Sequence, residues 1–177
     1  RPHRPPKPAS EQSKQCGSLT IENGQATLNL NGTRETLSAD GSASPWLASA
    51  LQGSAAEPVQ LVVSLAQLPL VATAADYDAL TALFLALAKT LQTVSHCNLS
   101  IITEAAQGMK GQQAVVRADQ AVVLGFAKNL LLELADRMQS TIDVEDWTAA
   151  TAQLCANALQ AAQSSPLLSV RQNQLLT

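Results

Sequence analysis

The chain is poor in aromatic residues, in charged residues and in cysteine, and each shortage excludes a class of protein. Aromatic residues are 3% of the 177 residues, so a core must be built mainly from Leu, Val, Ile and Ala. No apolar run reaches the roughly 18 residues that a membrane-spanning helix needs, so we expect no membrane contact. The net charge of −3 and the pI near 5.3 argue against nucleic acid as a partner, because phosphate binding needs a clustered basic surface.

The three cysteines, Cys16, Cys97 and Cys155, are an odd number at wide separations. Such spacing predicts neither a disulfide framework nor a zinc site. The start of the chain has no apolar segment of the kind that forms a secretory signal peptide. We therefore expect reduced thiols and a cytoplasmic protein.

Apolar residues make up 46% of the chain and charged residues 14%, a balance typical of one globular domain. Residues 1–17 differ, because prolines alternate with basic residues there, and proline at that density favours extended chain. We interpret residues 1–17 as a Pro-rich linker and residues 18–177 as the folded domain. A basic docking tail is the alternative interpretation of the first segment.

Two Asn-Gly pairs lie in the stretch 19–37, at Asn23-Gly24 and Asn31-Gly32. Asn-Gly readily adopts the positive φ angles of a tight hairpin turn, and apolar residues alternate with polar ones around the first pair. This pattern predicts a small β-hairpin or meander. Pro45 then stands where the first residue of a short helix is expected, with Ser44 as its N-cap.

Buried strands and amphipathic helices alternate in the rest of the chain. We predict strands at 59–65, 99–103, 141–144 and 167–176, and helices at 76–94, 114–138 and 146–162, the last one capped by Asp146. This alternation predicts an α/β fold, in which an open Rossmann-like parallel sheet is joined by right-handed crossovers and flanked by the helices.

The helix predicted at 114–138 has an unusual composition, because it is apolar nearly all round between Ala121 and Leu132. A helix without a polar face is expected to be deeply packed. Gly125 in its middle costs roughly 1 kcal/mol relative to alanine. We therefore expect this glycine to allow a close approach to a neighbouring element.

A nucleotide-binding Rossmann domain needs a glycine-rich turn after its first strand, so that backbone N–H groups can approach the pyrophosphate. No junction between a predicted strand and the following helix has the G-x-G-x-x-G spacing. The nearest approach is the pair Gly108 and Gly111. We therefore expect no cofactor and assign no cofactor-binding residue.

Residues suited to nucleophilic or reductase chemistry are present but badly placed. His96 and Cys97 are adjacent, yet they precede a strand, so they belong to the edge of the sheet opposite to the one where α/β sites form. Tyr77 is followed four residues later by Thr81, where the Tyr-x-x-x-Lys pair of short-chain reductases has its lysine. We assign no catalytic residue.

Three carboxylates, Asp143, Glu145 and Asp146, gather at the carboxyl end of a predicted strand, where a metal ion or an acid–base group could lie. No histidine stands near them in the sequence. Helix capping and a solvated loop explain Glu145 and Asp146 more simply than a site does. We assign no metal ligand.

Five segments together resemble a known family. Residues 120–134 read QAVVLGFAKNLLLEL, with IDVE at 142–145, VQLVVSL at 59–65, LSIIT at 99–103 and VRQNQ at 170–174. These segments resemble the QAALWGLGRVLALEHP helix, the LIDLDP, GVVHLWAL and LWVVT strands and the ALRDGR segment of ketoreductases from modular type I polyketide synthases. The order is the same, and the resemblance spans 59–177, about two-thirds of the chain.

All five landmarks belong to the structural subdomain of such a ketoreductase, which is a truncated Rossmann fold without cofactor. The resemblance implies a non-catalytic domain that supports an adjacent catalytic subdomain, and that subdomain carries NADPH and the β-ketoacyl substrate. The implied partners are this catalytic subdomain and other domains of the same polyketide synthase. The aromatic YRVDW-like strand of the family is missing at the front. This departure leaves open a pseudo-ketoreductase, as found beside methyltransferase or enoylreductase domains.

Two other functions stay open. A small NADPH-dependent reductase would use a non-standard nucleotide loop around Gly108 and Gly111. A docking or dimerisation module of a megasynthase would work through the basic start of the chain and the hairpin at 19–37. The supporting role predicts an exposed apolar patch or sheet edge at that hairpin or at the terminal strand 167–176.

Overall fold

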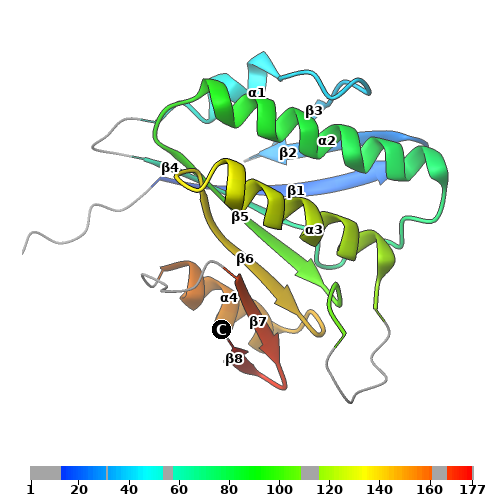
Figure 1. Ribbon diagram of the computed structural model, residues 1–177, viewed down its shortest axis with the longest axis vertical. Coiled ribbons are helices and arrows are strands. Elements are labelled where there is room, and N and C mark those ends of the chain that lie inside the picture. Colours follow the sequence, from blue (N-terminus) through cyan, green and yellow to red (C-terminus); the bar gives the residue numbers. More distant parts are fainter. Residues whose placement is uncertain (1–12, 31, 54–57, 109–115, 161–166, 177) are drawn as a thin grey trace, which may run out of the picture.

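The computed structural model describes residues 13–30, 32–53, 58–108, 116–160 and 167–176, and these ranges form an α/β fold (Figure 1). Within them the elements follow one another in this order: β1 (Ser13–Glu22), β2 (Gln25–Leu30), β3 (Thr33–Thr36), α1 (Pro45–Ala50), β4 (Val59–Ser64), α2 (Ala74–Thr93), β5 (Cys97–Glu104), α3 (Ala118–Glu133), β6 (Met138–Val144), α4 (Ala149–Gln160), β7 (Leu167–Arg171) and β8 (Gln174–Leu176). All strands belong to one sheet of order β3-β2-β1-β4-β5-β6-β7-β8.

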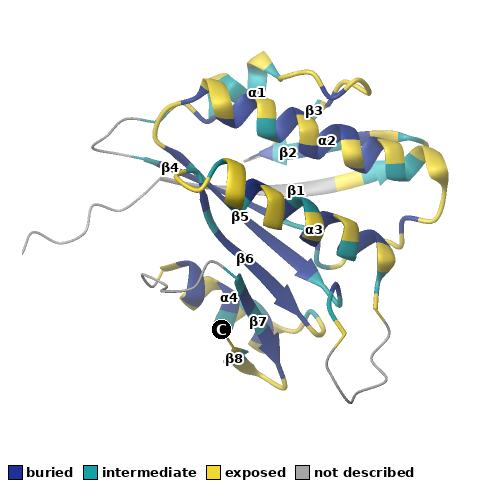
Figure 2. Cartoon of the chain, in the orientation of Figure 1, coloured by how far each residue is buried: buried dark blue, intermediate teal, exposed yellow. Residues whose placement is uncertain are grey.

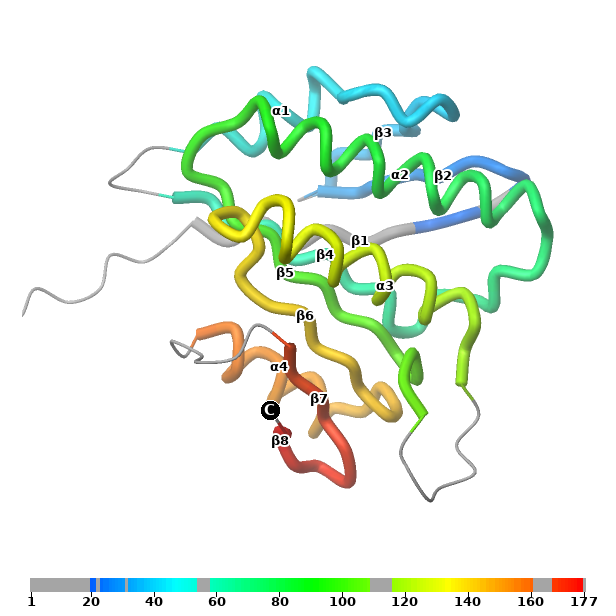
Figure 3. The backbone as a smooth tube through the Cα atoms, in the orientation of Figure 1, coloured from blue at the N-terminus to red at the C-terminus, as the bar shows by residue number. Residues whose placement is uncertain are grey.

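The centre of the sheet is parallel and consists of β1, β4, β5, β6 and β7. Antiparallel strands extend it on both sides, β2 and β3 on one and β8 on the other. The predicted α/β fold, a Rossmann-like parallel sheet flanked by helices with a small N-terminal hairpin, is therefore confirmed. The edge strands β3 and β8 lie at opposite ends of the molecule (Figure 3).

The turn between β1 and β2 is the first Asn-Gly pair. Asn23 and Gly24 have φ angles of 52° and 71°, the left-handed values that a tight hairpin turn requires. The Gly24 N–H donates to Oδ1 of Asp76 at 2.8 Å, which attaches the turn to the start of α2. Hydrogen bonds from the Thr73 hydroxyl and from this N–H hold the pKa of Asp76 below its ordinary value.

β1 begins at Ser13, so residues 13–17 belong to the sheet and not to the predicted linker 1–17. Residues 1–12 of that linker lie outside the described residues. β1 pairs with β2 on one side and in parallel with β4 on the other, where Ser13 stands opposite Val59. The sequence before Leu19 is polar and has no alternating pattern, so pairing with β4, and not local sequence, sets the start of this strand.

Helices cover both faces of the sheet. One core lies between the sheet and α1, α2 and α3, and it includes Leu61 and Ile101 of the strands. The next residues, Val62 and Ile102, point to the other face and pack with Cys155 of α4. The parallel strands follow one another across the sheet in chain order, so helices on opposite faces give crossovers of opposite hand. The prediction that all crossovers are right-handed is therefore wrong.

α3 is shorter and less buried than the sequence predicts. It runs from Ala118 to Glu133, and its outer face is open to solvent (Figure 2). The exposed fraction is 50% for Val122 and 84% for Leu132. Among the described residues, no atom other than those of its chain neighbours and of the nearby α3 backbone lies within 4 Å of the position that a Cβ on Gly125 would take. The deep packing predicted for 121–132 and the close contact predicted for Gly125 are both wrong.

The last predicted strand, 167–176, is a hairpin. β7 ends at Arg171, and Gln172 and Asn173 then turn the chain into β8 with φ angles of 46° and 57°. Asparagine tolerates this left-handed region better than most residues do. The short helix predicted at Pro45 is confirmed with its cap, because the Leu47 N–H donates to the Ser44 hydroxyl at 3.1 Å.

Aspartate substitutions on α3 distinguish its two faces. Leu130 is 3% exposed, so Leu130→Asp should lower the free energy of unfolding by more than about 3 kcal/mol, because it buries an unpaired charge. Leu132→Asp on the open face should change it by less than about 0.5 kcal/mol. Urea unfolding of dilute protein, followed by circular dichroism, measures both. Equal losses in the two variants would contradict this assignment of faces.

Candidate functional site

Open α/β sheets bind ligands at the carboxyl ends of their parallel strands, because the amino ends of the crossover helices meet there. In this chain the ends of β4 to β7 and the starts of α2, α3 and α4 form that edge. Within the described residues, charged and polar side chains gather at this edge. We call this group the carboxyl-end cluster; it consists of Glu104, Arg117, Asp119, Gln120, Asp143 and Arg171.

Asp143 on β6 is the centre of the carboxyl-end cluster and is 1% exposed. Its Oδ1 accepts hydrogen bonds from the Thr103 hydroxyl at 2.7 Å and from the Ala106 N–H at 2.9 Å. Its Oδ2 accepts one from the Gln107 N–H at 3.1 Å and forms an ion pair with Nη2 of Arg171. These donors compensate the buried carboxylate for its loss of water.

Arg171 completes this pair from β7 and is 6% exposed. Its Nη1 also donates to the carbonyl oxygens of Asp143, at 2.7 Å, and of Val170, at 2.9 Å. Its Nη2 reaches the carbonyl oxygen of Gln107 at 3.4 Å. One guanidinium therefore joins the ends of β6 and β7 to the loop that follows β5.

A second ion pair lies at the start of α3. Nη2 of Arg117 is 2.6 Å from Oδ2 of Asp119, which is 1% exposed and also accepts from the Val71 N–H at 3.3 Å. Arg117 lies 3.7 Å from Oε2 of Glu104 as well. A carboxylate of the chain itself thus lies at the amino end of α3, and the amino end of a helix is a place where proteins commonly bind anions.

Glu104 and Gln120 attach the loops to the strand ends. The Glu104 carboxylate accepts from the N–H of Gln67 at 3.0 Å and from the N–H of Trp147 at 3.1 Å. Gln120 donates to the carbonyl oxygen of Leu65 at 3.0 Å and accepts from the Glu104 N–H at 3.3 Å. The loops after β4 and β6 are therefore both held by Glu104.

Threonines cap the other two helices that start at this edge. The Thr73 hydroxyl accepts from the Asp76 N–H at 3.1 Å, and the Thr148 hydroxyl accepts from the Thr151 N–H at 3.2 Å. Thr148 thus takes the place at α4 that was predicted for Asp146, whose carbonyl oxygen accepts from the Thr151 hydroxyl instead.

Glu145 is exposed, as expected of a solvated loop, but it also has a structural contact. Its Oε2 accepts from the Gln172 N–H at 3.1 Å and so fixes the turn between β7 and β8. The three carboxylates that the sequence places together therefore separate into a buried ion pair, a turn contact and an exposed loop residue. Among the described residues, no three His, Cys, Asp or Glu are grouped so as to hold a metal ion.

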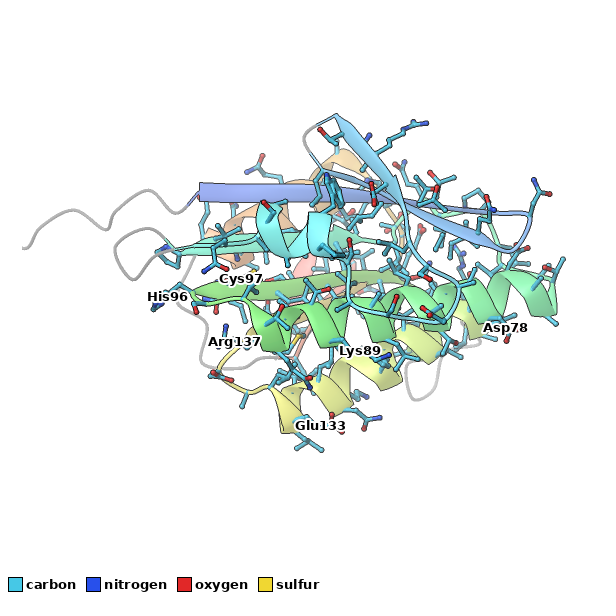
Figure 4. The ribbon with its side chains drawn as sticks, turned by 90° about the horizontal axis from the view of Figure 1, so that it is seen from above. Asp78, Lys89, His96, Cys97, Glu133 and Arg137 are labelled. Atoms are coloured by element: carbon cyan, nitrogen blue, oxygen red, sulfur yellow. The ribbon has the colours of Figure 1, made fainter. Side chains whose placement is uncertain are left out.

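His96 and Cys97 lie at the amino edge of the sheet, as predicted, and Asp78 near the start of α2 lies at the other end (Figure 4). Cys97 is fully buried, and burial raises the pKa of its thiol to about 11. Burial also raises the pKa of Cys155 on α4 to about 11. Both thiols stay protonated at neutral pH, and a protonated thiol is a poor nucleophile.

Tyr77 is half-buried on α2, and its carbonyl oxygen accepts from the Thr81 hydroxyl at 3.0 Å. Gly108 is exposed, whereas Gly111 lies outside the described residues, so the alternative nucleotide loop between them stays a prediction. No helix in the described ranges has the length and apolarity needed to cross a bilayer.

The sequence indicates Asp143 as a candidate site residue but does not indicate its partner. Asp143 stands between Ile142 and Val144 in an apolar run, and a charge in such a run requires a buried partner. Its partner Arg171 is 28 positions further along, and no local pattern connects the two. The Arg117–Asp119 pair was missed, although the arginine and the carboxylate are only two residues apart.

Removal of the Arg171 guanidinium should strongly destabilise the fold. Arg171→Met leaves the Asp143 carboxylate buried and unpaired, which should lower the free energy of unfolding by about 3 to 5 kcal/mol. Arg34→Met is a matched control, because Arg34 on β3 is exposed. This substitution should change the free energy of unfolding by less than about 0.5 kcal/mol. Urea unfolding measures both losses, and a loss for Arg171→Met no larger than the control's would show that the buried pair is not important.

The raised thiol pKa values predict a loss of stability at high pH. A thiol ionises near pH 9.0 in the unfolded chain and near pH 11 in the folded one. The stabilisation that the buried, protonated thiols give to the folded state is therefore complete below pH 9.0 and is lost as the pH rises through 11. The free energy of unfolding, measured across that range, should fall less steeply in Cys155→Ala than in the unmodified chain. Parallel pH profiles would contradict a shifted thiol at position 155.

The chain matches no model of a known protein family, and no curated protein matches it either.

Proposed function

We propose that this chain is a non-catalytic structural subdomain of a modular type I polyketide synthase, where it supports a ketoreductase or a neighbouring tailoring domain. The carboxyl-end cluster is the observation that carries the proposal. The edge where an α/β sheet would bind a cofactor is filled by side chains that satisfy one another. The ordered resemblance of residues 59–177 to the structural subdomain of ketoreductases supplies the context.

A filled edge opposes the binding of NADPH in two ways. A cofactor that displaced Arg171 would leave Asp143 buried and unpaired, at a cost of about 3 to 5 kcal/mol. A pyrophosphate at the start of α3 would also meet the carboxylates of Asp119 and Glu104, and like charges repel strongly where water is excluded. We therefore expect NADPH to bind to the neighbouring catalytic subdomain.

The same contacts suit a supporting role, because they hold the loops of this edge in fixed positions. The hairpin and the terminal strand, where a partner was expected to pack, form the two edges of the sheet as β3 and β8. Leu176 on β8 is 40% exposed. An edge strand offers unpaired N–H and C=O groups to another domain. We propose that β8 faces the catalytic subdomain, within a multienzyme of the cytoplasm.

A titration with NADPH tests the proposal. The chain of 177 residues should not bind NADPH in calorimetry, because its strand ends are filled. The same chain joined to the segment that follows it in its parent gene should bind. The following segment alone is the matched control, and it should unfold at a lower temperature than the joined protein if this chain supports it.

Each result has a distinct meaning. Binding by the isolated chain would overturn the proposal in favour of a small reductase. Binding by neither protein, with the stabilisation intact, would point to a pseudo-ketoreductase that keeps only the supporting role. A following segment that is equally stable alone would contradict the supporting role itself.

A further inference from the structure

The outer face of α3 has exposed residues at alternating steps of four and three positions. We call this set the α3 stripe; it consists of Ala118, Val122, Gly125, Asn129 and Leu132, all exposed. Val123 and Leu130, on the opposite side of the helix, pack in the core. Steps of three and four residues are the a and d positions of a heptad, the pattern by which two helices pack side by side.

The α3 stripe has the composition of a close contact between helices. Val122 and Leu132 keep apolar side chains in water, which is unfavourable unless another surface covers them. Gly125, between them, has open space where its Cβ would stand, so a second helix can approach the backbone closely. Asn129 is at the same heptad position as Val122, and an asparagine at one such position fixes the register of two paired helices.

Charges beside the stripe indicate what the second helix is. With Val122 and Asn129 at a, Lys128 is at g and Glu133 is at the following e; both are exposed. In a parallel pair of helices, g of one faces the e of the other that is five residues further on. Two copies of α3 in parallel would therefore place Lys128 opposite Glu133 twice. An antiparallel pair would place g opposite g and e opposite e, without this complementarity.

We propose that the chain forms a homodimer in which the α3 stripes of two copies pack in parallel about a two-fold axis along the helices. Val122 would meet its copy, and Asn129 would hydrogen-bond to its copy. The 16 residues of α3 give about 24 Å of helix for this contact. Because the core already holds α3 in place, no free energy is needed to form the helix on association. This inference is independent of the proposed function.

A hollow that three residues of the stripe help to line adjoins the proposed contact. It lies between α2 and α3, has a volume of about 310 Å³ and is lined by Phe84 and Phe126, among others. The rings of these two residues are 5.3 Å apart. Phe126 is at position e, so the partner's Ala121 would face it, and this small side chain leaves room for the ring. The stem of the partner's Lys128 would cover apolar surface next to Glu133.

Charge exchange between Lys128 and Glu133 tests the dimer. Lys128→Glu puts two glutamates opposite each other at both contacts, and Glu133→Lys does so with two lysines. Each variant alone should raise the dissociation constant of the dimer roughly tenfold in sedimentation equilibrium. A mixture of the two variants restores opposite charges at both contacts, so it should form a heterodimer as tight as the unmodified homodimer.

Lys89→Glu is the control, because it changes the net charge as Lys128→Glu does, at an exposed residue of α2 outside the stripe. It should leave the dissociation constant unchanged, and circular dichroism checks that every variant is folded. A chain that stays monomeric up to millimolar concentration overturns the proposal. A dissociation constant that neither substitution changes would overturn the parallel contact through α3. A mixture of the two variants that binds no more tightly than each variant alone would overturn it as well.

Discussion

The buried ion pair of Asp143 and Arg171 is the contact on which the carboxyl edge of the sheet depends. Removing two charges from water costs several kcal/mol for each ion, and only good geometry with further hydrogen bonds offsets that cost. Both conditions hold, because Thr103, Ala106 and Gln107 donate to the carboxylate while the guanidinium reaches main-chain carbonyls. β6 and β7 pair over the short stretch from Thr141 to Val144, so this ion pair adds a side-chain link where the ladder is short.

Stability and ligand binding compete for the same groups at this edge. A binding site keeps polar groups partly unsatisfied until the ligand arrives, whereas Asp143 and Asp119 have their partners already in the chain. The edge is therefore suited to holding loops in fixed positions. In the described part of the chain, the edge strands and one side of α3 are surfaces that stay open to other molecules.

The range of each interaction explains what could be predicted from the sequence. The Asn23-Gly24 turn and the Ser44 cap depend on neighbours a few positions away, so local pattern identified them. The strands β4 and β5 and the helix α2 between them follow from their hydrophobic pattern. The start of β1 and the partner of Asp143 depend on residues far along the chain, and no local pattern contains them. The site was therefore predictable in its position at the strand ends but not in its pairing.

The error about α3 has a different cause. In a helix that is apolar nearly all round, the apolar residues do not mark one side, so the sequence does not indicate which side faces the core. Val123 and Leu130 face inward, while Val122 and Leu132 face water. Apolar residues on two opposite sides of one helix cancel each other in the periodic pattern, so the sequence does not indicate a single apolar face. A helix needs apolar residues on both sides only if other surfaces pack against both sides. The lack of a single apolar face led to the wrong prediction of deep burial. The same lack is expected of a helix that packs between its own sheet and a second copy of the chain.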